Sequence, residues 1–235
     1  MKWLLLKLLA AVLTFTIGVG ASLIWSTYLD APDLDIPQAD EILPVYQRHC
    51  FPGLAIASEL KTNQYFPDQS FGNTPLSRYF KNGWYSRNLV AMNEPSMFKR
   101  DERGERYRFL WLRSFGYPIA IRVEQEGDRR FIVTKESHGA GGYDTRRLLS
   151  ESRRPLSAGE WFVLEDKLEQ ACFWRLPSIE EEPTGEDGAQ WILEGQLDGR
   201  YHVVDRWSPT SGAYREACMY LLRISGIDLS REALY

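Results

Sequence analysis

The chain has few of the residues that build metal, cofactor or nucleophilic sites. It contains three histidines and three cysteines in 235 residues. Cys50, Cys172 and Cys218 lack the spacing of metal ligands. No Gly-X-Ser-X-Gly sequence marks a nucleophile elbow, and neither a phosphate loop nor a dinucleotide fingerprint is present. We therefore predict no cofactor and no metal, and no motif fixes a reaction.

The chain also lacks a large net charge. Its formal charge is −4 at pH 7, which argues against nucleic acid as a partner. The charge is unevenly distributed, because residues 99–154 hold 14 Lys/Arg against 9 Asp/Glu, whereas residues 155–200 hold 3 against 11. This pattern favours two oppositely charged faces of one domain and leaves open an anionic-ligand or partner surface on the first segment.

A long apolar run stands near the N-terminus. Residues 8–25 contain no charge, and Lys2 and Lys7 precede them. About 20 apolar residues form a helix that spans a bilayer, and the flanking lysines place the N-terminus in the cytoplasm and the body outside. We expect an uncleaved anchor in the inner or plasma membrane. The alternative is a signal peptide cut after Ala21, with small Val19 at −3, which leaves the body periplasmic or secreted.

Four segments follow from composition. Residues 1–29 are the anchor or signal peptide, and residues 30–45, with three prolines and five acids, are a Pro/Asp-rich spacer. Residues 46–98 are predicted to be an irregular lead-in of short helices and loops. Residues 99–235 form the globular domain, and the 44% hydrophobic content of the chain excludes a disordered body.

The globular segment is predicted to be α+β. Alternating residues at 106–114, 119–123 and 129–135 indicate an antiparallel meander, followed by a short helical run at 145–150. A hairpin over 189–207 turns at Asp198-Gly199, a dipeptide that favours a type I′ turn. The predicted domain is an antiparallel sheet of about five strands with two helices packed on one face.

Two helices carry local signals. Ser157 and Glu160 form a capping box at the start of the first, which should run to about Phe173. The second follows Pro209, and Gly226 is placed to end it. Cys172 and Cys218 each lie on one of these helices, and we expect both to be small buried thiols.

The predicted hairpin brings two acids to one face of the sheet. A two-residue loop pairs Gly195 with His202 and Ile192 with Asp205, so Glu194 and Asp205 become diagonal neighbours. Two nearby acids can supply general acid and base groups for a carbohydrate, although such acids more often pair with arginines. The weak catalytic candidates are His138, His202, Glu194 and Asp205.

A glycine-rich turn offers a second candidate site. Residues 138–144 follow a predicted strand, and backbone N–H groups of such a turn can bind an anion with help from nearby basic side chains. The alternative is an ordinary turn that needs positive φ. The candidate anion-binding residues are Lys135, Gly139, Gly141, Gly142 and Arg146.

Three runs carry a family resemblance: KESHGAGGYD (135–144), DGAQWILEG (187–195) and GRYHVVDRWSP (199–209). They resemble those of uncharacterised bacterial proteins with an N-terminal membrane segment, over roughly residues 75–225. The resemblance implies a bacterial envelope setting and assigns no catalytic residue, because no activity is established for such proteins.

Together these observations predict a membrane-anchored extracytoplasmic module that binds an envelope protein or an anionic ligand. The alternative is an anchored hydrolase that acts on an anionic or carbohydrate substrate. An enzyme requires its polar groups to meet in one place, whereas a binding module can use an exposed aromatic or charged patch.

Overall fold

The computed structural model describes residues 65–72, 75–98, 104–139, 147–180 and 187–229, all within the compact unit Gly53–Tyr235. The predicted anchor, its alternative cleavage point and the spacer lie outside these residues. No helix in the described part of the chain is both long and apolar enough to cross a membrane.

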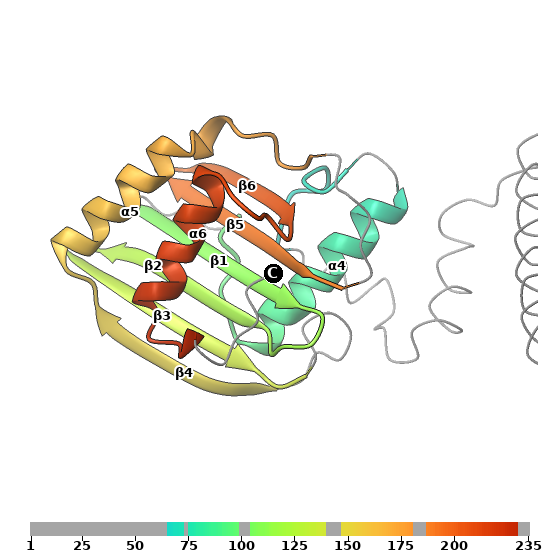
Figure 1. Cartoon of the computed structure of the whole chain (residues 1–235), viewed down its shortest axis with the longest axis horizontal. Coiled ribbons are helices and arrows are strands. Elements are labelled where there is room, and N and C mark those ends of the chain that lie inside the picture. Colours follow the sequence, from blue (N-terminus) through green and yellow to red (C-terminus); the bar gives the residue numbers. More distant parts are fainter. Residues whose placement is uncertain (1–64, 73–74, 99–103, 140–146, 181–186, 230–235) are drawn as a thin grey trace, which may run out of the picture. The chain divides into compact units, whose positions relative to one another are not determined.

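A six-stranded antiparallel sheet lies at the centre of the described unit, in the order β4-β3-β2-β1-β5-β6 (Figure 1). The prediction of an antiparallel α+β domain is confirmed, with six strands rather than about five. The strands are β1 (Glu105–Arg113), β2 (Ile119–Glu126), β3 (Arg129–Ser137), β4 (Leu148–Pro155), β5 (Ala189–Leu197) and β6 (Arg200–Trp207).

The additional strand is β4, whose first residues fall where a short helical run was expected. It is an edge strand with mostly exposed residues, so it lacks the apolar alternation that reveals a half-buried strand. The guanidinium of Arg153 lies over the ring of Phe131 and pairs with Glu126 at 2.8 Å. Charged side chains on an exposed edge protect a sheet from pairing with other chains.

Helices α5 (Ala158–Gln170) and α6 (Ala213–Ile224) cover one face of the sheet (Figure 1). From β4, Arg154 links them, because its guanidinium binds the carboxylate of Glu160 at 2.7 Å and the carbonyl of Ile224 at 2.7 Å. The core between the helices and the sheet is apolar and aromatic, and it includes Tyr107, Phe109, Trp111, Ile121, Trp161, Leu164, Trp191, Leu193, Val204 and Leu221.

The predicted capping box at the start of α5 is confirmed. The backbone N–H of Glu160 donates to Ser157 Oγ at 3.2 Å, and the N–H of Ser157 donates to the Glu160 carboxylate at 2.9 Å. The end of α5 differs from the expectation, because the helix stops at Gln170 and Cys172 adopts a left-handed φ of 51°. The Cys172 side chain is consequently exposed, whereas Cys218 on α6 is buried as expected.

Helix α4 (Pro75–Ala91) covers the opposite face of the sheet (Figure 1). It has 17 residues and lies in the segment where short helices and loops were expected. Its sequence contains residues typical of loops, but their polar groups find partners: Asn82 donates to the carbonyl of Phe66, and Asn88 donates to the carbonyl of Trp84. Packing of Tyr85 and Leu89 against the sheet outweighs the weak helix propensity.

The β5–β6 hairpin has the predicted register. Gly195 pairs with His202 and Ile192 pairs with Asp205. Asp198 and Gly199 have φ values of 47° and 83°, as a type I′ turn requires. The hairpin therefore contributes one set of side chains to the face under α5 and α6, and the alternate set to the face under α4.

Candidate functional site

Glu94 follows α4 and is buried against three neighbouring strands. Its Oε2 lies 2.9 Å from Nε of Arg122 on β2 and 3.4 Å from Nη1 of Arg108 on β1. Its Oε1 lies 3.3 Å from Nζ of Lys135 on β3. Burial raises the pKa of Glu94, but the three positive charges outweigh it and hold that pKa below its ordinary value. Glu94 is therefore a carboxylate that ties the α4 segment to the sheet.

Glu194 on β5 extends this group of charges. Its carboxylate accepts from Arg108 Nε at 2.7 Å and from the hydroxyl of Tyr201 at 2.9 Å. Burial lowers the pKa of Arg108, but the charges of Glu194 and Glu94 raise it by more, so the guanidinium stays charged. We call these side chains the Glu94 cluster: Glu94, Arg108, Arg122, Lys135 and Glu194.

Asp205 on β6 occupies the same face and has its own partners. Its Oδ2 accepts from Nζ of Lys81 at 2.9 Å and from the hydroxyl of Tyr85 at 3.0 Å, both on α4. Burial raises the pKa of Asp205, and the charge of Lys81 opposes that rise. Asp205 thus forms a second polar connection between α4 and the sheet.

The two histidine candidates lie elsewhere. His202 faces the side of the sheet that α5 covers, where its Nε2 lies 3.0 Å from the carbonyl oxygen of Leu176 and its ring meets Phe173 edge to face. Burial lowers the pKa of His202, which favours the neutral imidazole. His138 follows β3, with its ring centroid 5.8 Å from that of Tyr117.

The four catalytic candidates therefore do not form one constellation. Glu194 and Asp205 share a face, as the register predicted, but each is bound by different partners. His202 lies on the opposite face, and His138 lies beyond the end of β3 beside Tyr117. No group of His, Cys, Asp and Glu within the described ranges could hold a metal ion.

The structure describes only the first and last residues around the glycine-rich turn. Gly139 has a φ of 109°, and the backbone N–H of His138 donates to the carbonyl of Arg147 across the turn. Gly141, Gly142 and Arg146 lie outside the described residues. The ammonium of Lys135 is occupied, because it binds Glu94 and donates to the carbonyl of Asn93 at 2.9 Å. Anion binding at this turn stays a prediction without help from that lysine.

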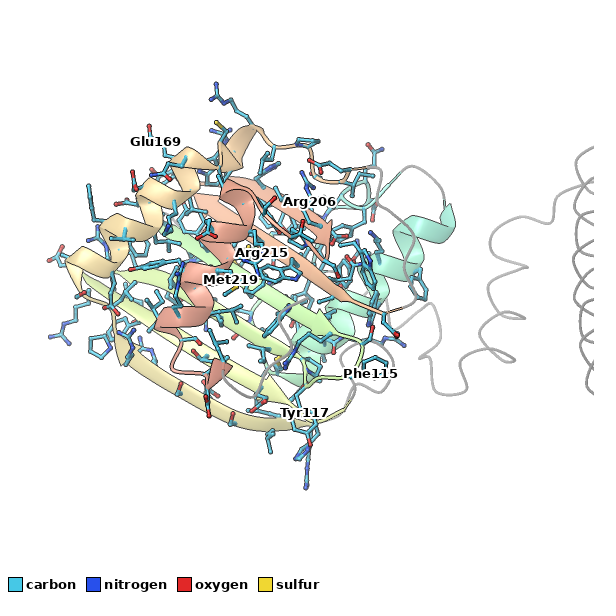
Figure 2. The ribbon with its side chains drawn as sticks, in the orientation of Figure 1. Phe115, Tyr117, Glu169, Arg206, Arg215 and Met219 are labelled. Carbon is cyan, nitrogen blue, oxygen red and sulfur yellow. The ribbon has the colours of Figure 1, made fainter. Side chains whose placement is uncertain are left out.

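The β1–β2 turn carries an exposed aromatic pair at the end of the sheet (Figure 2). Phe115 is 75% exposed and Tyr117 is 45% exposed. The Tyr117 ring also packs against His138. We call Phe115 and Tyr117 the aromatic tip. A single exposed ring is common on protein surfaces, but two exposed rings on one turn form a small apolar patch and a candidate contact surface.

The backbone that carries the aromatic tip is firmly held. Arg113 stacks on the Trp111 ring at 4.1 Å and donates to the carbonyl of Tyr117 at 3.0 Å. The same guanidinium fills the space beside Gly116, where an added Cβ would lie 2.4 Å from its Cζ. The backbone N–H of Ser114 donates to the carbonyl of Gly188 at 2.9 Å. The tip is therefore preorganised, which lowers the entropy lost on binding.

The sequence alone did not identify either feature. It left residues 115–118 only as the connection between the predicted strands at 106–114 and 119–123, although two aromatic residues flanking a turn glycine indicate exposed rings. It anticipated arginine partners for the paired acids, and Glu194 has one in Arg108. It did not identify Glu94, because no local pattern links one acid to three later strands.

Comparison with protein-family models, with curated proteins and with solved structures found no match. The function is therefore inferred from the residues of this chain alone.

Proposed function

We propose that this protein is a membrane-anchored extracytoplasmic binding module that contacts an envelope component through its aromatic tip. The apolar run at residues 8–25, with Lys2 and Lys7 before it, supports the anchor and its orientation. The described unit supplies a rigid platform beyond the anchor, and Phe115 and Tyr117 supply the contact.

The exposure of Phe115 in a held turn carries this proposal. Phe115 exposes 75% of its surface, although its backbone is fixed through Arg113 and Ser114. An exposed phenyl ring contributes little to the stability of an isolated domain, since burial of apolar surface is what stabilises it. A ring that is both exposed and preorganised is suited to binding.

The hydrolase alternative receives no comparable support from the described residues. General acid and base groups must reach the same substrate atoms. Glu194 is held between Arg108 and Tyr201, Asp205 is held by Lys81 and Tyr85, and His202 faces the other side of the sheet. A binding module requires no such convergence.

The anchor is tested by extraction and protease digestion. Membranes washed with high salt and carbonate should retain the full chain, and protease added outside the inner membrane should digest its body. Recovery of a soluble protein that begins near Ser22 would contradict the anchor and leave the cleaved signal peptide.

The contact is tested by alkylation of a cysteine at the tip. A Cys50→Ser, Cys172→Ser chain retains buried Cys218, and Phe115→Cys adds one reactive site. We expect a membrane-impermeant maleimide to label that site at least threefold more slowly in native membranes than after detergent solubilisation. The matched control is Phe162→Cys on α5, since Phe162 is 68% exposed. Equal labelling at positions 115 and 162 in native membranes would overturn the role of the tip.

A further inference from the structure

The aromatic tip is too small to be a complete protein-binding surface. Aromatic side chains bury roughly 150–250 Å² each, so Phe115 and Tyr117, at 75% and 45% exposure, offer on the order of 200 Å². A stable protein interface buries about 800 Å² on each partner. A chain that is already tethered to a bilayer can contact it through a smaller area, because the tether keeps the two together.

We propose that the aromatic tip inserts into the interfacial region of the phospholipid bilayer in which the chain is anchored. This inference rests on the proposed function, because it names the envelope component that the same tip contacts. Phenyl and phenol rings partition into the headgroup region, where an apolar body and a polar hydroxyl are both accommodated. Phe115 and Tyr117 are two such rings on a single turn.

The length of the tether places the bilayer within reach of the tip. About 40 residues separate Trp25, at the end of the apolar run, from Tyr65, and a chain of that length spans at most roughly 140 Å. The bilayer is therefore present at a high effective concentration, and a contact too weak to recruit a free protein can still hold a tethered one.

The charges around the tip favour aromatic partition over ionic attraction. The exposed residues nearby include a base, Arg147, and an acid, Asp187. Arg147 accepts a backbone hydrogen bond from His138, whose ring packs on Tyr117, and Asp187 precedes Gly188, which binds Ser114. Half-exposed Glu136, which pairs with Ile119, adds a second acid. Because bases are not in excess among the described residues around the tip, attraction to an anionic bilayer contributes little, and insertion should change little with added salt.

The test uses the full chain in vesicles of phosphatidylethanolamine and phosphatidylglycerol. In the Cys50→Ser, Cys172→Ser background, a nitroxide is attached at Phe115→Cys, where its apolar ring replaces the phenyl, and at Phe162→Cys as the control. Spin relaxation measures collisions with oxygen, which concentrates in the bilayer, and with a nickel chelate, which stays in water. We expect the oxygen-to-nickel ratio at 115 to be at least threefold that at 162, and to fall towards it when Tyr117→Ser is added.

The possible failures are distinguishable. Equal ratios at 115 and 162 in a chain that resists carbonate extraction overturn the lipid contact alone. If position 115 is nevertheless protected from maleimide in native membranes, the tip contacts a protein or glycan, and the proposed function stands. Extraction by carbonate overturns the anchor and this inference together.

Discussion

The two faces of the sheet are stabilised in different ways. Under α5 and α6 the buried side chains are mainly aromatic and aliphatic, and Trp161, Leu164, Phe109 and Trp191 belong to one cluster. Under α4, a smaller apolar cluster that includes Tyr85 and Leu89 lies on the same face as buried charges from five strands. One sheet therefore separates an apolar layer from a partly ionic layer.

The comparison shows what each kind of contact specifies. Apolar burial stabilises in proportion to area and sets few directional requirements. Buried charges gain little over apolar residues, because the loss of hydration offsets their attraction. They do require particular partners, and Glu94 finds three cations only when the segment after α4 lies at one position on the sheet. The ionic layer thus fixes the placement of α4 more than it adds to stability.

The largest expected effect comes from removing the central charge of the ionic layer. Glu94→Gln leaves Arg108, Arg122 and Lys135 without that carboxylate, and breaking a buried ionic group in this way costs about 3–5 kcal/mol. Urea unfolding followed by tryptophan fluorescence measures the change. The control is Glu126→Gln, which breaks the exposed pair with Arg153 and should cost about 0–1 kcal/mol. Equal losses in the two variants would mean that the buried Glu94 carboxylate contributes no more than an exposed one.

The same variant carries a pH signature. Because the folded pKa of Glu94 lies below its ordinary value, its contribution is present above the unfolded pKa of about 4.3 and is lost as pH falls towards the lower folded value. The stability difference between the wild type and Glu94→Gln should therefore shrink on acidification below about pH 5. A difference that is constant from pH 7 to pH 3 would mean that Glu94 is not a stabilised carboxylate.

Substitutions in the apolar layer should lower stability by an amount that does not depend on pH. Leu164 is fully buried on α5, and Leu164→Ala leaves a cavity that costs about 3 kcal/mol. The neighbouring Val163 is 37% exposed, so Val163→Ala should cost well under about 1 kcal/mol. The loss for Leu164→Ala should be the same at pH 7 and pH 4. A strong pH dependence would show that the two layers are energetically coupled.

Sequence reasoning succeeded where the physical signal is local. Ser157 and Glu160 are three residues apart and specify a helix start by themselves, and Asp198-Gly199 specifies a hairpin turn and hence its register. Trp161, Leu164 and Leu168 recur at helical spacing because one face of α5 is buried.

Sequence reasoning failed where contacts between residues far apart in the chain determine the structure. The polar residues of α4 adopt a helical conformation because the Asn82 side chain donates to the Phe66 carbonyl and because Tyr85, on the same helix, packs against the sheet. The partners of Glu94 lie on three later strands, and nothing near Glu94 in the sequence points to them. The aromatic tip was missed for another reason: the composition does not distinguish the exposed ring of Phe115 from the buried ring of Phe109, and only the glycine between Phe115 and Tyr117 indicates the turn.

The hairpin serves both layers, so disturbing its turn should weaken both without a pH signature. Gly199 has a φ of 83°, and no atom lies within 4 Å of the place where a Cβ would stand. Gly199→Val therefore adds backbone strain rather than a clash, at roughly 1–3 kcal/mol. Gly159 on α5 also has open space but no positive φ, so Gly159→Val serves as the unstrained control in the same unfolding experiment. A cost at Gly199 no larger than at Gly159 would contradict the type I′ turn.

The smallest expected effect tests the edge of the apolar layer. Ser157→Ala removes the hydroxyl that accepts from the N–H of Glu160, and loss of such a cap costs about 1 kcal/mol. The main contact of the Glu160 carboxylate remains, because the hydrogen bond from Arg154 is the chief reason that its pKa falls to about 2. Ser157→Thr should restore most of the loss, since a threonine hydroxyl can also cap the helix and donate to the Glu160 carboxylate, as the Ser157 hydroxyl does at 2.8 Å. Amide hydrogen exchange should locate the change in the first turn of α5, with β5 and α4 unaffected. Equal exchange changes at α4 would mean that a perturbation at α5 crosses the sheet, and that the two layers do not unfold independently at their edges.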